Sequence, residues 1–361
     1  MKVVTLFGTR PEIIRLSRVI ALLDEFCDQS LVFTGQNYDP NLSDIFFEQL
    51  DVRKPDYHMG IQSSSFGEQA GQIIEKADRF FEVTQPDKLL ILGDTNSGLA
   101  AIPAARRGIP VYHMEAGNRS YDDRIPEELN RRLIDHASTV LMPYTQRSKE
   151  NLIREGIERQ RIFVTGNPIL EVLEHFEPKI AASNILSELG VYPKQFFLVT
   201  LHRAENVDVP ERLREYVSAF EQLAADYGWP VIISTHPRTR VRMEQQGIQV
   251  SNPLVQFLEP FGLLDFIKLE KNAACVLTDS GTVQEEACIF RVPNVTIRDV
   301  TERAETTEVG SNVLSGADRE QIVRLVRLVL ASPPEWDPPE DYTKRNVADT
   351  VVRIMLSHLH Q

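Results

Sequence analysis

The sequence has few cysteines and no long apolar run. Cys27, Cys275 and Cys288 are its only cysteines among 361 residues, and their scatter argues against a disulfide framework or a zinc site. Each is expected to be a small buried hydrophobic residue. No apolar run approaches the ~20 residues that a membrane-spanning helix needs, and Arg10 ends the apolar start too early for a signal peptide. These absences favour a cytoplasmic protein without a membrane partner.

Positive charge is also scarce. Lys and Arg together number 39 against 52 Asp and Glu, which gives a formal net charge of -13. This balance argues against a nucleic-acid partner, because nucleic-acid binding favours basic patches. A protein of this charge that holds a diphosphate must do so with a few local cations and helix N-termini.

What the chain does have is a regular alternation of short apolar runs and helical patterns. Its length exceeds the size at which a single core keeps growing, so two domains are expected. Almost wholly apolar runs are typical of strands covered on both faces of a parallel sheet, and the alternation predicts a doubly wound α/β fold. The predicted strands are 3–7, 30–33, 88–92, 196–200, 231–234 and 275–278. The predicted helices are 11–25, 67–83, 147–155, 210–226, 317–331 and a last one near 343–358.

This alternation runs through the chain twice, and its second series begins near Phe196. Two such domains facing each other would leave a cleft, and in open α/β sheets a ligand lies beyond the carboxyl ends of the strands. The residues that follow each predicted strand are therefore the candidates for a functional site.

The first such turn reads Gly8-Thr9-Arg10-Pro11-Glu12. Gly8 permits a tight turn and Pro11 suits the start of a helix, whose free N–H groups can bind an anion beside Arg10. An ordinary capped turn with a surface arginine would have the same sequence. The segment is neither a Walker A nor a G-x-G-x-x-G pattern, which disfavours a P-loop NTPase and a simple dinucleotide enzyme.

Three acids follow in the first half of the chain. Asp94 comes directly after the strand 88–92, and Glu115 comes after the next strand. Glu127 begins a helix, with Arg131 four residues later on the same face. Carboxylates that converge on one site can carry proton transfers, since like-charge crowding raises the pKa of one of them. Each acid alone could equally be a helix cap or a surface ion pair.

The second half places histidines and a possible phosphate cradle at its strand ends. His202 and His236 each follow a strand, where a histidine can donate to a phosphate or protonate a leaving group. Ser280-Gly281 opens a helix after another strand and is similar to a backbone cradle for phosphate. Glu286 on that helix could accept from a ribose hydroxyl. Lone histidines are usually structural, and that alternative stays open for both.

Several of these segments, taken in order, match one family. The sequence resembles the non-hydrolysing UDP-N-acetylglucosamine 2-epimerases over nearly its whole length. The segments that carry the resemblance are Gly8-Thr9-Arg10-Pro11-Glu12, Gly93-Asp94-Thr95, His113-Met114-Glu115-Ala116-Gly117, Pro126-Glu127-Glu128-Leu129-Asn130-Arg131, Thr278-Asp279-Ser280-Gly281, Gln284-Glu285-Glu286 and Arg298-Asp299-Val300-Thr301-Glu302-Arg303.

The resemblance implies a GT-B-like fold and a reaction. Residues 1–167 would form a Rossmann-like domain with the catalytic acids, 168–342 a Rossmann-like UDP-binding domain, and the helix in 343–361 would pack back on the first. The family removes the C2 proton of the sugar while UDP leaves C1, and UDP then adds back to the 2-acetamidoglycal. The resemblance implies a UDP-sugar substrate, no nicotinamide or other cofactor, no essential metal, and a homodimer.

The resemblance also assigns roles to residues by position. It implies that Asp94, Glu115 and Glu127 are the acid/base groups, and that His202 is a catalytic partner of the diphosphate. The implied substrate-binding residues are Arg10 at a phosphate, Ser280 and Gly281 at the phosphate-binding helix, Glu286 at the ribose, Phe266 and His236 beside the uracil, and Arg15, Arg131 and Arg303.

This chain departs from the family pattern at three places. It has Arg15 where many members have Lys, Asn118 where Leu is usual, and Thr34-Gly35-Gln36-Asn37-Tyr38-Asp39 where a Gln-His-Arg stretch helps bind an activating substrate molecule. The last change argues against such activation. Asn118 is similar to a branch that epimerises C2 of UDP-2-acetamido-2,6-dideoxy-L-talose to give UDP-N-acetyl-L-fucosamine, whereas Thr301-Glu302-Arg303 fits the ordinary branch. We therefore place UDP-GlcNAc and UDP-ManNAc first and the 6-deoxy sugar second.

Three other functions remain compatible with these residues. A GT-B glycosyltransferase would share the fold and donor pocket but would need an acceptor. A hydrolysing epimerase would release free ManNAc and UDP. A UDP-sugar-binding regulator would bind without exchanging the C2 proton.

Overall fold

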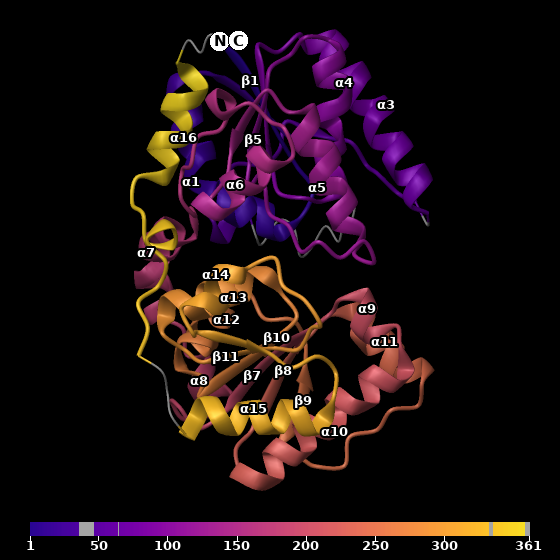
Figure 1. Cartoon of the computed structure of the whole chain (residues 1–361), viewed down its shortest axis with the longest axis vertical. Helices are drawn as coiled ribbons and strands as arrows, with labels where there is room; N and C mark the ends of the chain where they lie inside the picture. The colour runs from indigo at the N-terminus through magenta and orange to yellow at the C-terminus, as the bar shows by residue number, and fades with distance from the viewer. Residues whose placement is uncertain (36–46, 64, 332–334, 358–361) are drawn as a thin grey trace. The chain divides into compact units, whose positions relative to one another are not determined.

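A computed structural model describes residues 1–35, 47–63, 65–331 and 335–357. The chain forms two compact units, Met1–His175 with Glu340–Gln361 and Phe176–Pro339. Each unit contains one six-stranded sheet, and all its strand pairings are parallel (Figure 1). Two doubly wound α/β units are what the sequence predicts, so the predicted fold class is confirmed.

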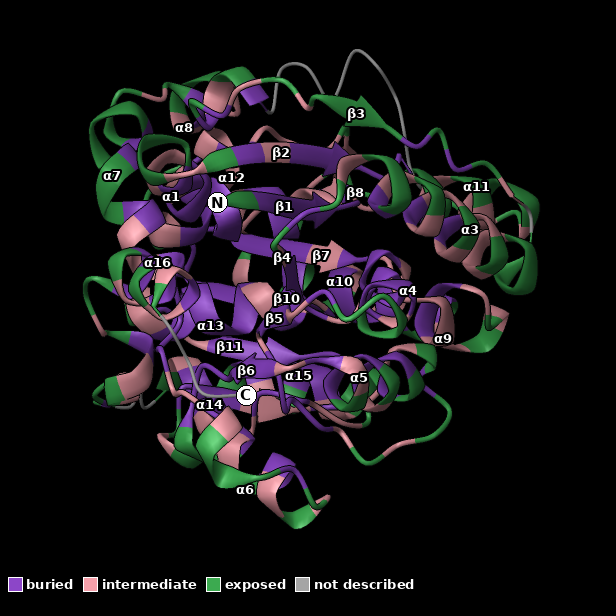
Figure 2. Cartoon of the chain, turned by 90° about the horizontal axis from the view of Figure 1, so that it is seen from above, coloured by how far each residue is buried: buried purple, intermediate pink, exposed green. Residues whose placement is uncertain are grey.

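The sheet of the first unit has the strand order β3-β2-β1-β4-β5-β6. Its strands are β1 (Lys2–Phe7), β2 (Asp28–Phe33), β3 (Tyr57–His58), β4 (Lys88–Leu92), β5 (Val111–Met114) and β6 (Val140–Met142). Its helices are α1 (Arg10–Phe26), α3 (Phe66–Thr84), α4 (Ala101–Arg106), α5 (Pro126–Ala137), α6 (Gln146–Arg154) and α16 (Val347–Leu356). Helices α1 and α16 cover one face of the sheet, and α3, α4 and α5 cover the other (Figures 1 and 2).

The sheet of the second unit has the order β12-β11-β10-β7-β8-β9. Its strands are β7 (Phe197–Leu201), β8 (Val231–Thr235), β9 (Val255–Leu258), β10 (Cys275–Thr278), β11 (Asn294–Thr296) and β12 (Asn312–Leu314). Its helices are α8 (Ile185–Glu188), α9 (Ala204–Val207), α10 (Pro210–Tyr227), α11 (Pro237–Gln245), α12 (Leu263–Asn272), α13 (Gly281–Phe290), α14 (Ala304–Glu308) and α15 (Arg319–Ala331). The division between the two units falls within α7 (Ile169–Ala181).

The apolar runs are strands that are buried on both faces. In β7, Phe197 and Val199 pack in the core cluster that contains residues of α10 and α15. Leu198 lies between them and packs in the opposite cluster, with Leu269 of α12 and Val283 of α13. Because side chains alternate across a strand, covering both faces requires every position to be apolar. Strand β7 is accordingly mostly buried in Figure 2, whereas the edge strand β3 is exposed.

The structure differs from the predicted elements in short strands, in one helix start and in helices that were not predicted, namely α4, α8, α9, α11, α12 and α14. Strands β6, β9, β11 and β12 have three or four residues each, too few to set up a recognisable period. Helix α16 begins at Val347 and not near 343, because Asn346 before it has a left-handed φ of 63°. Residues 36–39 of the segment that departs from the family pattern, and 358–361 of the predicted last helix, lie outside the described residues.

Two other expectations concern membranes and thiols. Among the described residues, no helix combines the length and apolar character that crossing a membrane requires. Cys275 and Cys288 are buried as expected, but Cys27 is only partly buried at the end of α1, where its Sγ donates to the Leu23 carbonyl. The expectation of full burial is therefore wrong for Cys27.

Candidate active site

Asp94 lies in the turn after β4 and is held by helix α5. Arg131 donates from Nε to Asp94 Oδ2 at 2.8 Å, and its Nη2 lies 2.7 Å from the same oxygen. Asn130, the neighbouring residue on α5, donates to the Asp94 carbonyl at 3.0 Å. Helix α5 therefore holds both the carboxylate and the backbone carbonyl of Asp94.

Glu115 occupies the turn after β5, the next strand of the sheet. Its φ of 63° lies in the left-handed region, a strained conformation for a residue other than glycine. Arg15 of α1 brings Nε within 3.9 Å of Glu115 Oε2, and Asn118 donates to Oε1 at 3.2 Å. A Cβ placed on Gly93 would lie 3.9 Å from Glu115 Oε2. The structure thus brings Glu115 beside the turn that carries Asp94.

Gly117 completes the Glu115 turn and has no room for a side chain. Its φ is 80°, and a Cβ there would lie 2.3 Å from the carbonyl oxygen of Ser148. The Gly117 carbonyl accepts from Asn151 of α6 at 3.0 Å. The close approach of α6 explains why this turn contains glycine.

The start of α5 contains two acids with different surroundings. Glu127 is half-buried at the second helical position, whereas Glu128 is buried. Glu128 accepts from Ser120 N at 3.0 Å and from Arg131 Nη1 at 2.7 Å. Burial alone would raise the pKa of Glu128, but these contacts outweigh it and lower the pKa. The i+4 spacing places Glu127 and Arg131 on one face of the predicted helix. The contact of Arg131 with Glu128, three residues before it, is not among the predictions from the sequence.

Glu12 is a buried acid to which the sequence alone assigns no role. Its carboxylate accepts from Gly8 N at 3.0 Å, Thr9 Oγ1 at 2.7 Å and Thr95 Oγ1 at 3.0 Å. Burial raises the pKa of Glu12 to about 7, against the lowering effect of these hydrogen bonds. Glu12 therefore connects the turn after β1, which carries the half-buried Arg10, to the residue that follows Asp94.

In the second unit, His202 is oriented by a buried aspartate. His202 follows β7, and its Nδ1 lies 2.9 Å from Asp279 Oδ1. The other oxygen of Asp279 accepts from His202 N at 2.9 Å and Arg203 N at 2.8 Å. Burial would raise the pKa of Asp279, but the contacts with His202 and these backbone groups lower it strongly. Asp279 is thus a carboxylate that fixes both the ring and the backbone of His202.

His236 lies close to His202. The two ring centroids are 5.8 Å apart. His236 caps α11 by accepting from Arg238 N at its Nδ1, at 3.1 Å, so its ring proton is on Nε2. The two histidines that follow neighbouring strands are therefore brought together.

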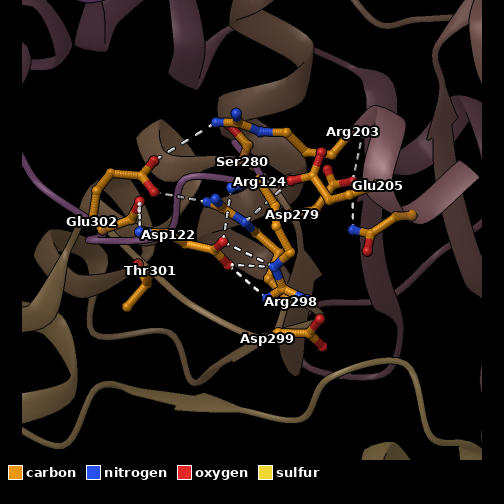
Figure 3. A network of polar contacts seen from close by, with 12 residues as sticks. Asp122, Arg124, Arg203, Glu205, Asp279, Ser280, Arg298, Asp299, Thr301 and Glu302 are labelled. Carbon is orange, nitrogen blue, oxygen red and sulfur yellow. Dashed lines mark hydrogen bonds and ion pairs between the residues drawn. The ribbon is translucent and has the colours of Figure 1, made fainter. Parts of the chain in front are cut away.

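Helix α13 begins at Gly281, and charged side chains crowd its first turn. A Cβ on Gly281 would lie 2.6 Å from Glu302 Oε1, so no larger residue fits without displacing Glu302. Glu302 accepts from Arg298 Nη1 at 2.9 Å and lies 3.6 Å from Arg203 Nη2, as Figure 3 shows. Ser280, the N-cap residue, has its hydroxyl 3.0 Å from that of Thr282.

The remaining predicted residues of the second unit lie on α12, on α13 and before α14. Phe266 packs partly buried against the core cluster that contains Leu269. Glu286 is 5% exposed and faces Glu270, which is wholly buried. Burial, and then the charge and hydrogen bond of Glu286, raise the pKa of Glu270 well above its usual range. Arg303 pairs with Glu285.

The predicted residues therefore fall into two groups. Contacts join Arg15 to Glu115 and Arg131 to Asp94 in the first unit, and His202 to His236 in the second. Within the described ranges, no three His, Cys, Asp or Glu side chains are grouped in a way that could hold a metal ion.

Known proteins resemble this chain in sequence and in fold. A family model described as UDP-N-acetylglucosamine 2-epimerase matches residues 23–356. A Methanocaldococcus jannaschii protein of that name is 41% identical over 98% of this chain and 99% of its own. A Pseudomonas aeruginosa protein named UDP-2,3-diacetamido-2,3-dideoxy-D-glucuronate 2-epimerase is 39% identical over 93% of this chain and 94% of its own. The crystal structure of the Methanocaldococcus jannaschii UDP-GlcNAc 2-epimerase in complex with UDP-GlcNAc and UDP matches with a TM-score of 0.93 at 40% identity, over 98% of this chain and 99% of that one. The chain therefore belongs to the UDP-N-acetylglucosamine 2-epimerase family of isomerases.

Proposed function

We propose that this protein interconverts UDP-GlcNAc and UDP-ManNAc by removing and returning the proton at C2 of the sugar. UDP leaves C1 as the C2 proton is abstracted, a 2-acetamidoglycal is held by the enzyme, and UDP adds back with a proton delivered to the opposite face. The observation that carries this proposal is the pair of arginine-contacted carboxylates, Asp94 and Glu115, in adjoining strand-end turns.

The chemistry needs an acid/base group on each face of the sugar ring. A group that abstracts a proton must accept it in one protonation state and return it in the other, which carboxylates can do when they are held within hydrogen-bonding reach. Asp94, Glu115 and Glu127 divide these roles. Arg131 and Arg15 place positive charge beside the first two and orient them.

The nucleotide is assigned to groups that are mainly in the second unit. The N-terminus of the ten-residue helix α13, at Ser280 and Gly281, offers N–H groups and a positive dipole end to the diphosphate. His202, fixed through Asp279, donates to the leaving diphosphate. The other proposed ligands are Arg10 at a phosphate, Glu286 at the ribose, Phe266 and His236 beside the uracil, and Arg303.

Sequence identity does not choose the sugar. Relatives that are 41% and 39% identical bear names with different sugars, UDP-N-acetylglucosamine and a UDP-diacetamido-glucuronate. UDP-GlcNAc ranks first because a structure with this nucleotide sugar bound matches at a TM-score of 0.93. UDP-2-acetamido-2,6-dideoxy-L-talose ranks second because Asn118, the residue that differs from the usual leucine, contacts the carboxylate of Glu115.

The test is to incubate the protein with UDP-GlcNAc in D₂O and to follow C2 by NMR. Deuterium at C2 together with UDP-ManNAc is the expected result. Free ManNAc would indicate a hydrolysing enzyme, and product only after addition of an acceptor would indicate a glycosyltransferase. Binding of UDP-GlcNAc and of the 6-deoxy talose sugar with no exchange in either would indicate a regulator and would overturn the proposal.

The proposal extends to a homodimer in the cytoplasm that works without an added cofactor. Sedimentation equilibrium of the purified chain should give twice the mass of 41.1 kDa. A single species at the monomer mass across the working concentration range would contradict the dimer. We also expect full activity after dialysis against a chelator, because the proposed reaction needs no metal ion.

A further inference from the structure

A buried histidine lies between the two turns that carry Asp94 and Glu115. His113 belongs to β5 and is 1% exposed. Its Nε2 is 2.8 Å from the carbonyl oxygen of Gly93, and its Nδ1 is 2.9 Å from Asp135 Oδ1. Asp135 comes from α5 and is also fully buried. The two ring nitrogens therefore face two oxygens on separate elements of the first unit.

Both oxygens are acceptors only. A backbone carbonyl cannot donate, so Nε2 must carry a hydrogen. Asp135 is ionised, because Oδ2 lies 2.8 Å from Arg119 Nη2 and accepts from Gly117 N at 3.2 Å. Burial would raise the pKa of Asp135, but the contacts with His113 and Arg119 lower it. The Asp135 carboxylate therefore places a negative charge beside Nδ1 of the ring, which Nε2 anchors to the Gly93 carbonyl.

The carboxylate beside the ring is itself paired with an arginine. Arg119 donates from Nε and Nη2 to the two oxygens of Glu155, at 2.8 and 2.6 Å. Arg119 thus places its positive charge between the carboxylates of Asp135 and Glu155. A buried ionic group is tolerated when it is paired and hydrogen-bonded in this way.

The network reaches the backbone of both turns. Gly93, whose carbonyl faces His113, directly precedes Asp94 and donates its N–H to the Met114 carbonyl at 3.0 Å. On the other side, Arg119 donates to the Asn118 carbonyl at 2.8 Å, and the Asn118 side chain donates to Glu115. A change at His113 would therefore be felt at both carboxylates.

We propose that His113 is a positioning residue for the epimerase reaction, held between the Gly93 carbonyl and Asp135 so that the Asp94 and Glu115 turns keep a fixed spacing. The positioning role rests on the proposed function. The contact of Nε2 with the Gly93 carbonyl does not, and it can be measured on the protein without substrate.

The first experiment is nitrogen NMR of the full chain labelled with ¹⁵N-histidine. His113→Asn identifies which of the eight histidine signals belongs to His113. We expect Nε2 of His113 to carry a proton that is protected from exchange by burial and by the hydrogen bond to the Gly93 carbonyl. A ring whose Nε2 carries no proton would overturn the contact with the Gly93 carbonyl and with it the positioning role.

The second experiment compares His113→Gln with His113→Asn. A glutamine amide nitrogen reaches about as far as Nε2 and can still donate to the Gly93 carbonyl, whereas an asparagine amide reaches only as far as Nδ1 and Asp135. We expect kcat to fall about 100-fold in His113→Asn and at most about 10-fold in His113→Gln. The Kd for UDP should stay within about twofold of wild type in both.

A stability control separates positioning from folding. Phe81→Leu truncates a core residue of α3 and should lower the melting temperature while leaving kcat unchanged. Equal kcat in the two His113 variants, or losses of kcat that follow the melting temperature across all three variants, would overturn the positioning role. A wild-type protein that exchanges no C2 proton would instead refute the proposed function and leave the NMR result standing.

Discussion

Arg131 holds Asp94 through two nitrogens on one oxygen, with Nε and Nη2 at 2.8 and 2.7 Å from Oδ2. The third nitrogen of the guanidinium is 2.7 Å from Glu128 Oε2. Glu128 is itself fixed by the backbone N–H groups of Ser120 and Tyr121. The direction of the Asp94 carboxylate is thus determined by a guanidinium that cannot turn without losing contacts on both sides.

Replacing this arginine by lysine should disturb catalysis more than binding. An ammonium is a point charge and cannot contact Asp94 and Glu128 in the same planar arrangement. We expect Arg131→Lys to lower kcat by about 10- to 100-fold, as for a misplaced catalytic group, with the Kd for UDP unchanged. Steady-state kinetics and calorimetry measure the two quantities. Arg132→Lys is the matched control, because the neighbouring Arg132 contacts Glu128 only at 3.5 Å from a partly exposed position, and it should retain wild-type kcat.

Asp94→Asn tests the carboxylate itself. The amide keeps the shape of Asp94 but cannot take up a proton, so we expect turnover to fall by about 1,000-fold or more while UDP affinity stays nearly intact. Turnover is measured by incorporation of deuterium at C2, and UDP affinity is measured by calorimetry. Asp123→Asn, on the exposed side of the same region, should behave as wild type. Wild-type turnover in the Asp94 variant would remove this residue from the chemistry.

The strand-end argument selects Asp94, Glu115, His202 and Ser280 as candidates because each follows an apolar run within a residue or two. These positions depend on local sequence and on the rule that ligands meet the carboxyl ends of parallel strands. The sheet order brings these strand ends side by side, since β4 and β5 are neighbours, as are β7 and β10.

The groups that hold these residues could not be found in the same way. His113 and Asp135 are 22 positions apart and meet only because α5 packs against β5. His202 and Asp279 are likewise far apart in the sequence and meet through tertiary packing, as do Glu12 and Thr95. Each pairing depends on tertiary packing, for which a single sequence offers no periodic signal. Glu128 is the exception, since its i+3 spacing from Arg131 is local and visible in the sequence.

Glu286 and Glu270 together allow a test of ribose recognition. A hydrogen bond from a ribose hydroxyl to a charged group contributes about 1.5–3 kcal/mol, so Glu286→Gln should weaken UDP binding by about 10- to 100-fold. Calorimetry with 2′,3′-dideoxy-UDP should show no difference between wild type and variant. Glu270→Gln is the control, because Glu270 has a raised pKa and the neutral amide mimics its protonated form. An equal loss of affinity for both ligands would contradict the ribose contact.

Glu12 should make the stability of the first unit depend on pH. Its pKa is about 7 in the folded protein and 4.5 as the ordinary value, so between these pH values the native state keeps a proton that the unfolded chain has lost. Stability contributed by this group is therefore fully present below pH 4.5 and is lost as the pH rises to about 7. The difference between the two pKa values corresponds to about 3 kcal/mol.

Glu12→Gln removes this dependence. As the pH rises from 5 to 8, the free energy of unfolding of the variant should therefore increase relative to that of wild type, by up to about 3 kcal/mol. The sequence contains two tryptophans, Trp229 and Trp336, and both lie in the second unit, so fluorescence would follow the wrong part of the molecule. Hydrogen exchange of peptides from β1 and α1 reports the unit that contains Glu12. Glu25→Gln, an exposed position on the same helix, controls for the loss of one charge.

The comparison of these two variants decides whether Glu12 binds the extra proton. If the exchange rates of the Glu12 and Glu25 variants change with pH in parallel, Glu12 does not bind the extra proton. If the Glu12 variant instead gains protection relative to the Glu25 variant as the pH rises, the acid that connects the Arg10 turn to Thr95 titrates near neutral pH. The packing of this turn beside Asp94 then changes with pH over the same range, because the hydrogen bonds of Glu12 differ between its two protonation states.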